Sequence, residues 1–144
     1  MKIKSIFNNT EKIPSKYTAD GDDINPPLEI FDIPQNAKTL VLIVDDPDAP
    51  AGVWVHWILF NIPIINKIKE NSVPNNSKPG MNSAGKTKYH GPSPPSGTHR
   101  YFFKLYALDT MLNLPQASKR SEIEQAMQGH ILAKAEIIGL YSRT

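Results

Sequence analysis

Three apolar segments dominate the hydrophobic pattern of this chain. Residues 40–44 form an unbroken apolar run rich in β-branched side chains, and residues 53–62 and 101–108 show a similar pattern. Continuous apolar runs of this length are typical of strands that are covered on both faces. We therefore predict that these three strands form the core of a β-rich fold.

Weaker patterns surround these strands. Residues 2–6 alternate polar and apolar positions, which predicts a half-buried strand, and residues 17–28 are rich in Asp, Gly, Asn and Pro, which predicts a loop. Residues 66–90 contain almost no large apolar side chain. Because this stretch is too long for a simple turn, we expect a functional or mobile loop.

The C-terminal part of the chain predicts one helix and one more strand. Ser121 and Glu124 match a capping box, which would begin a short helix that Gly129 ends. Residues 131–138 are compatible with a second helix or with a strand. Polar positions there alternate with apolar neighbours, and this period of two favours a strand.

Length and composition indicate one domain. A chain of 144 residues can bury roughly two thirds of its unfolded surface, so residues 1–144 are expected to fold as a single unit. There is no cysteine in the sequence, which excludes disulfides and thiol chemistry. The 13 prolines lie at segment ends and not in a repeat, as is typical of turns in a β-rich fold.

Charge and hydropathy restrict the partners of the chain. Sixteen basic and fourteen acidic residues give a formal net charge of only +2, and the lysines are scattered, which argues against nucleic acid. No apolar run is long enough to span a bilayer, and residues 1–8 lack the apolar stretch of a signal peptide. We expect a cytoplasmic protein without stable membrane insertion.

Two separated motifs place acids and histidines at the ends of predicted strands. The first is DDPDAP at residues 45–50, which follows the apolar run 40–44, with His56 just beyond it. The second is GPSPPSGTHRY at residues 91–101, which leads directly into the third strand. Strand ends are where rigid sites are often built, and the prolines make both motifs stiff.

The residues alone leave the role of these motifs open. Asp and Pro are common turn formers, and a single His in an apolar strand is more often a core residue than a ligand-binding one. If the strands that carry Asp46, His56 and His99 are neighbours, however, the carboxylate can orient one imidazole toward an anion. Affinity for phosphate would then rise as pH falls toward and below about 6.5, the ordinary pKa of His.

Two enzymatic alternatives are weaker. A metal hydrolase would use the histidines and aspartates, but His56 and His99 are 43 positions apart and no local ligand spacing is present. Acyl transfer would need a nucleophile, and Ser93 and Ser96 near His99 lack a nucleophile-elbow sequence. We rank a hydrolase last.

Three motifs give the chain a resemblance to a known family. DPDAP at 46–50, HWILFNIP at 56–63 and the 91–101 motif resemble the phosphatidylethanolamine-binding protein family, in its compact bacterial and archaeal form. The similarity extends from about residue 17 to residue 143. It implies a β-sandwich of two antiparallel sheets in Greek-key order, with one or two short helices near the C-terminus.

The resemblance also implies a function and a site. It implies a non-enzymatic binding protein with a regulatory or inhibitory role, which uses no metal and no cofactor and holds a small phosphorylated or carboxylate ligand. An inhibitor of serine proteases or kinases is the alternative, and compact members of the family often pair as homodimers. The positions that match the family's pocket are Asp46, Asp48, His56, Pro92, Pro94, His99 and Tyr101.

Several residues near the motifs carry separate expectations. Lys88 and His90 depart from the usual family pattern, and His90 either adds an imidazole to the pocket rim or points to solvent. Arg100 should point away from His99 and pair with Asp45 or a carboxylate of the first loop. Trp54 is expected in the core or at the pocket rim. The family's C-terminal extension is not seen after residue 144, which predicts a more open pocket.

Overall fold

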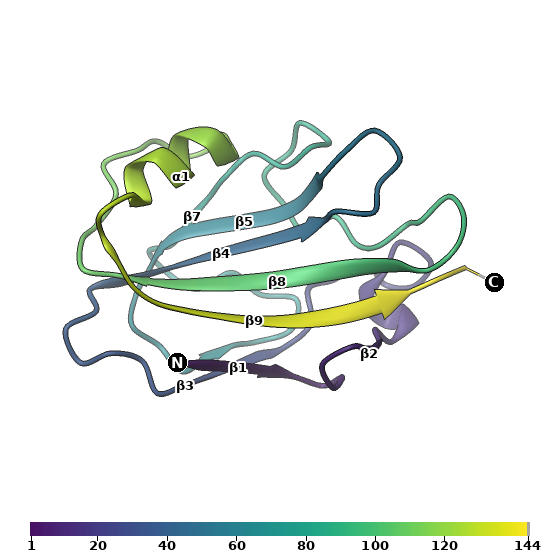
Figure 1. Ribbon diagram of the computed structural model, residues 1–144, viewed down its shortest axis with the longest axis horizontal. Coiled ribbons are helices and arrows are strands. Elements are labelled where there is room, and N and C mark those ends of the chain that lie inside the picture. The colour runs from purple at the N-terminus through teal and green to yellow at the C-terminus, as the bar shows by residue number, and fades with distance from the viewer. Residues whose placement is uncertain (144) are drawn as a thin grey trace.

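Two β-sheets packed face to face, with one helix outside the larger sheet, make up the computed structural model, which describes residues 1–143 (Figure 1). The larger sheet has the strand order β2-β9-β8-β4-β5-β7 and the smaller one β1-β3-β6. Neighbouring strands are antiparallel, except that β2 and β9 are parallel. The predicted sandwich is confirmed, with this one parallel pair added.

The elements have the following bounds: β1 Lys2–Ser5, β2 Glu11–Lys12, the 3-10 helix η1 Ser15–Tyr17, β3 Leu28–Phe31, β4 Thr39–Asp46, β5 Trp54–Ile62, β6 Lys67–Ile68, β7 Lys78–Pro79, β8 His99–Leu108, α1 Arg120–Met127 and β9 Ile131–Tyr141.

Strand β4 lies at the centre of the molecule and is buried along its whole length. Leu40, Leu42 and Val44 face the smaller sheet, while Val41 and Ile43 pack in a second cluster beneath α1. Burying one such side chain fully contributes about 1.5–3 kcal/mol, so this strand anchors both layers. The prediction of a central strand covered on both faces is confirmed for β4.

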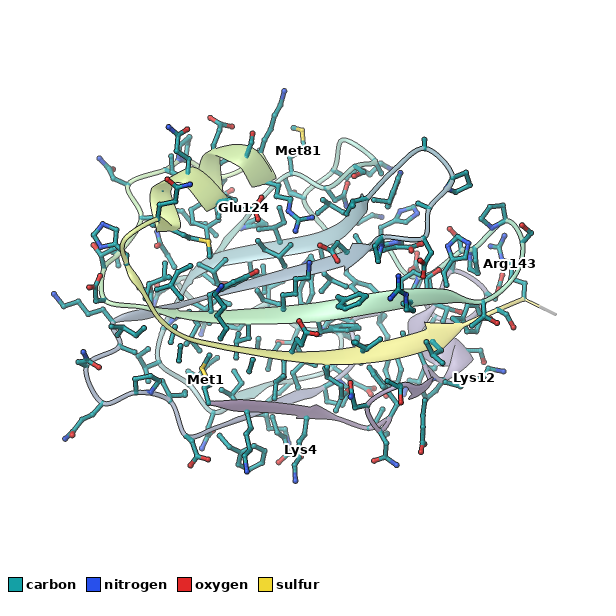
Figure 2. The ribbon with its side chains drawn as sticks, in the orientation of Figure 1. Met1, Lys4, Lys12, Met81, Glu124 and Arg143 are labelled. Atoms are coloured by element: carbon teal, nitrogen blue, oxygen red, sulfur yellow. The ribbon has the colours of Figure 1, made fainter. Side chains whose placement is uncertain are left out.

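Strand β8 does not fit that prediction. Its inward residues are buried, but Phe102, Lys104 and Tyr106 on the outer face remain partly exposed. The reason is that α1 covers only the β4–β5 part of the sheet, where Ile123 and Met127 pack on the outer cluster. Figure 2 shows Glu124 on α1 and Lys4 on β1 at opposite edges of this view, with the long strands of the larger sheet between them.

The predicted helix and final strand are both present, with different boundaries. The helix begins at Arg120 and not at Ser121, because the Oε1 atom of Glu122 accepts a hydrogen bond from the Lys119 backbone N–H at 2.9 Å. Gly129, with φ +81°, follows the helix end as predicted. After it, β9 runs from Ile131 to Tyr141, which confirms the strand and extends it past residue 138.

Residues 66–90 are more structured than the sequence predicted. Strands β6 and β7 interrupt the segment, and Tyr89 near its end is buried. The Asn82 side chain donates to the Lys88 carbonyl at 2.8 Å, which folds residues 82–88 back on themselves. No helix within residues 1–143 is long and apolar enough to cross a membrane.

Candidate functional site

A cavity of about 350 Å³ lies at one end of the larger sheet. The side chains that form its floor come from the C-terminal end of β4 and the N-terminal ends of β5 and β8: Asp46, Trp54, His56, His99 and Tyr101. Antiparallel pairing of β4 with both neighbours brings these ends together. Both β4 and β8 extend further than predicted, so Asp46 and His99 sit on rigid strands and not on loops.

Two loops form the rim of this cavity. The β4–β5 loop contributes Ala49 and Pro50, and the segment before β8 contributes Ser93, Pro94 and Pro95. Both loops project from the same end of the molecule, at the right of Figure 1. The rim is therefore largely apolar, whereas the floor carries the polar groups.

Asp46 orients His99. The Nδ1 atom of His99 lies 2.7 Å from Oδ2 of Asp46, and both side chains are less than a tenth exposed. The other oxygen of Asp46 accepts the Asp48 backbone N–H at 2.7 Å, which holds the carboxylate in place. The imidazole therefore presents Nε2 as its free nitrogen, the orientation that the sequence hypothesis required.

His56 is held by a different partner. Its Nδ1 lies 2.6 Å from the backbone carbonyl oxygen of His90, so Nδ1–H donates and Nε2 is left to accept. Burial lowers the pKa of His56 to about 4, although the carbonyl contact opposes the shift. His56 is therefore neutral at neutral pH, and a cation near pH 6.5 has to come from another group.

The Tyr101 hydroxyl is a buried donor with no hydrogen-bond partner among the described residues. Burial raises the pKa of this phenol, so it stays protonated and can donate. Most buried polar groups are paired, and an unpaired hydroxyl in a cavity wall is a prepared position for a ligand atom.

Asp48 binds Arg100 and does not line the cavity. Its carboxylate accepts hydrogen bonds from the Arg100 backbone N–H, Nε and Nη2, each at 2.9 Å. The guanidinium contacts hold the pKa of Asp48 down at about 2. Arg100 points away from His99, as predicted. The predicted pairing with Asp45 is wrong, because Asp48 in the β4–β5 loop binds the guanidinium instead.

Asp45 instead joins the sheet to the helix. Its Oδ2 lies 2.9 Å from Lys104 Nζ and 2.7 Å from Arg120 Nη2, on the face of the sheet opposite Asp46. This cluster was not predicted from the sequence. The one feature that could have indicated it is the Asp45-Asp46 pair, because adjacent residues of a strand point to opposite faces of the sheet.

The remaining predicted residues divide between the cavity wall and its support. Pro94 lines the cavity, while Pro92 is buried behind it and accepts the Ala19 backbone N–H at 3.0 Å. Trp54, at the start of β5, lines the cavity where the floor meets the rim. His90 is half-buried, and its ring packs on Trp54 with ring centroids 4.9 Å apart instead of pointing to solvent.

Five of the seven predicted site residues thus surround one cavity, namely Asp46, His56, Pro94, His99 and Tyr101. Asp48 and Pro92 support it from behind. Of the other lining residues, Ala49, Pro50, Ser93 and Pro95 lie inside the same two motifs, and Trp54 lies between the first motif and His56. Within residues 1–143, no three or more His, Cys, Asp or Glu side chains are grouped in a way that could hold a metal ion.

The sequence and the fold of this chain have clear counterparts among known proteins. The chain belongs to the phosphatidylethanolamine-binding protein family, whose sequence model matches residues 3–142. Among curated relatives, a UPF0098 protein of Methanothermobacter thermautotrophicus is 50% identical over 99% of both chains. A UPF0098 protein of Pyrococcus horikoshii is 49% identical over 99% of this chain and 77% of its own length.

Solved structures agree with this assignment. The crystal structure of a phosphatidylethanolamine-binding protein homologue from Chlamydia trachomatis superposes with a TM-score of 0.96 at 39% identity, covering 99% of this chain and 97% of that one. Escherichia coli YbcL gives a TM-score of 0.91 at 25% identity, covering 99% and 98%.

Proposed function

We propose that this protein is a non-enzymatic binding protein whose cavity holds a phosphate or carboxylate group, in a regulatory or inhibitory role. The observation that carries the proposal is Tyr101, a residue of the cavity lining whose buried hydroxyl has no partner among the described residues, together with the Asp46–His99 pair in the same lining. Together these groups offer an anion one neutral donor and one imidazole that a carboxylate holds ready for protonation.

Charge in the cavity depends on histidine. Among the described lining residues there is no Lys or Arg, and Asp46 is a negative charge that would repel an anion. Protonated His99 balances Asp46 and turns Nε2 into a donor. Because His56 stays neutral, its Nε2 can accept a hydrogen bond from a P–O–H group, which both H₂PO₄⁻ and a phosphomonoester monoanion carry. The cavity therefore suits a monoanion, with oxygens toward His99 and Tyr101 and an O–H toward His56.

This arrangement makes binding dependent on pH. The anion binds the form of the protein that carries the extra proton, so affinity is expected to rise as pH falls from about 8 to about 5, by up to about tenfold per pH unit. Isothermal titration calorimetry with inorganic phosphate measures this trend. Sulfate is the control ligand: its own charge is constant over this range, so the pH dependence of its binding reports the protein alone. Because it has no O–H for His56 Nε2, it should bind more weakly than phosphate at each pH.

The outcomes are distinct. Phosphate and sulfate that both bind more tightly at low pH support the proposal. Flat affinity for both ions contradicts the protonation step, and no binding of either ion at any pH contradicts the anion site itself.

A second function is favoured by one observation at the cavity mouth. The β4–β5 loop projects with Val53 56% exposed, and the Asp48–Arg100 pair ties it down. Inhibitors of serine proteases often present such an exposed, pre-organised loop, since pre-organisation lowers the entropy cost of binding. Inhibition of a protease or kinase, cytoplasmic location and homodimer formation stay predictions.

A further inference from the structure

Trp54 divides the polar floor of the cavity from its apolar rim. It is the first residue of β5, lies two residues before His56 on the same face of the strand, and lines the cavity. Its ring centroid is 4.8 Å from that of His56 and 4.9 Å from that of His90, with interplanar angles of 60° and 52°. Trp54 therefore contacts an imidazole on each of two neighbouring segments.

His90 is fixed so firmly that its ring can hold the indole. Its backbone N–H donates to the His56 carbonyl at 3.1 Å, and its own carbonyl accepts from His56 Nδ1 at 2.6 Å. The preceding residue is anchored as well, because the Tyr89 hydroxyl donates to the Tyr17 carbonyl at 2.7 Å. The His90 side chain does not line the cavity, so it acts on a ligand through the rings it packs near, namely Trp54 at 4.9 Å and, at the longer distance of 6.0 Å, His56.

The volume of the cavity indicates how large a ligand could contact Trp54. A volume of about 350 Å³ falls in the range of roughly 300–1,000 Å³ of pockets that enclose whole small molecules. A bare tetrahedral anion on the floor would contact Tyr101 and the histidines and leave the space between Trp54, Pro94 and Pro50 unfilled. That space is bounded by one aromatic ring and two apolar pyrrolidine rings.

We propose that His90 is a specificity-determining positioning residue, which clamps Trp54 so that the cavity selects anions carried on a flat, unsaturated group. This inference rests on the proposed anion site and names the class of ligand that the site prefers. Aromatic pairs of this kind contribute about 0.5–1.5 kcal/mol beyond the area they bury, which converts to roughly twofold to tenfold in affinity when the clamp is lost.

The test compares three ligands by calorimetry at one pH: inorganic phosphate, phenyl phosphate and butyl phosphate. The last two carry the same anion on a flat ring and on a flexible chain. We expect the wild-type protein to bind phenyl phosphate at least about tenfold more tightly than inorganic phosphate, and more tightly than butyl phosphate.

The variants isolate the role of His90. His90→Ala should reduce the preference for phenyl phosphate by roughly threefold to tenfold, with inorganic phosphate affinity within about twofold of wild type. His90→Phe, which keeps an aromatic ring and removes the imidazole, should retain the preference. His130→Ala is the matched control, because His130 is a half-exposed histidine paired with Asp109 at the start of β9, outside the cavity.

Each contrary result has a separate meaning. Failure of all three ligands to bind overturns the proposed anion site and this inference with it. Binding of phosphate with no gain for phenyl phosphate, or an equal gain for butyl phosphate, overturns this inference alone. An equal loss of phosphate and phenyl phosphate affinity in His90→Ala shows a purely structural role and also overturns it. Unchanged phosphate binding in each variant is the check that the site is still folded.

Discussion

The Tyr101 hydroxyl is expected to lower the stability of the free protein and to raise its affinity for a ligand. It is buried without a partner among the described residues, so in the free protein it carries a desolvation cost of about 1–3 kcal/mol. A ligand oxygen that accepts from it would remove that cost. The Asp46–His99 pair beside it, by contrast, is satisfied with or without a ligand.

Replacing Tyr101 by Phe is therefore expected to separate the two properties. The free energy of unfolding should stay constant or rise by about 1 kcal/mol, since an unpaired polar atom is removed. Phosphate affinity should fall roughly tenfold, the typical loss for a hydrogen bond to a charged group. Urea unfolding and calorimetry measure the two effects.

Tyr141 provides the matched control. Its hydroxyl donates to Asp20 at 2.8 Å and lies outside the cavity lining, so Tyr141→Phe should lower stability without changing phosphate affinity. A Tyr101→Phe protein with unchanged phosphate affinity would show that the hydroxyl takes no part in binding.

Residue-scale features were predictable where a motif carried them. Acids and histidines at strand ends marked Asp46, His56 and His99 as candidates, but it was the family resemblance that grouped them into one site and added Tyr101. The partners of Asp45 and Arg100 were not predictable, because each contact joins residues more than 50 positions apart in sequence. Which of several nearby carboxylates an arginine reaches is decided by loop geometry, and no local pattern encodes it.

At the scale of elements, the β4–β5 loop is tied to strand β8 by a forked ion pair. Arg100 contributes its backbone N–H and two side-chain nitrogens to one carboxylate, Asp48. Bidentate geometry makes this pair stronger than a single contact, but both side chains are partly exposed, so solvent screens it. The pair fixes the loop that carries Ala49 and Pro50 at the rim of the cavity.

Removing the guanidinium should cost stability in a pH-dependent way. The pKa of Asp48 is lowered to about 2 in the folded protein, against about 3.9 unfolded, so its contribution is present above pH 4 and is lost as pH falls through about 2. Arg100→Met should therefore lower the unfolding free energy by a small but measurable amount at pH 7 and by almost nothing below pH 2.

Urea unfolding at the two pH values measures that difference. Lys16→Met is the control, because it removes a single-contact exposed pair with Glu70, and it should have a smaller effect at pH 7. A loss for Arg100→Met that is the same at both pH values would mean that the pair with Asp48 is not its cause.

Element types and order were largely predictable, because apolar period and length mark β4, β5 and β8 clearly, whereas the sequence of β9 was also compatible with a helix and only its period of two favoured a strand. The short strands β6 and β7 were not, since two residues carry no measurable period. The exposed outer face of β8 was also missed. The outer face of β8 carries apolar side chains although it is only partly buried. How much of that face is buried depends on where α1 packs, which the sequence of β8 does not show.

At the scale of the whole molecule, a close approach joins the N-terminal segment to the last long strand. Strand β2 pairs in parallel with β9, and Ile13 just beyond it is fully buried against Gly139. A Cβ atom on Gly139 would lie 2.3 Å from Ile13 Cγ1 and 2.9 Å from Phe7 Cε2. The absence of a side chain at Gly139 lets residues 11–13 pack against β9 at one edge of the sandwich.

Adding that methyl group should destabilise the fold as a whole. Gly139→Ala is expected to lower the unfolding free energy by about 1–3 kcal/mol, the usual cost of overpacking. Combined with Ile13→Ala, which removes the clashing atoms, the loss should be clearly smaller than the sum of the two single losses. Urea unfolding of the four proteins in this cycle measures the coupling.

Leu112→Ala serves as the control partner, because Leu112 belongs to the separate cluster under α1. Its loss should add to that of Gly139→Ala without coupling. Additive losses for the Ile13 pair would show that the two segments do not meet as described.

The split of the cavity between strands and loops has a consequence for engineering. The polar floor belongs to paired strands, so changing it disturbs the sheet, whereas residues 49–53 and 95–98 emerge from the sheet and carry little of the core. Libraries randomised only in these two stretches would leave the acid and the two imidazoles in register. The same framework could thus be given new recognition properties by exchanging its loops, much as antibody frameworks accept new hypervariable segments.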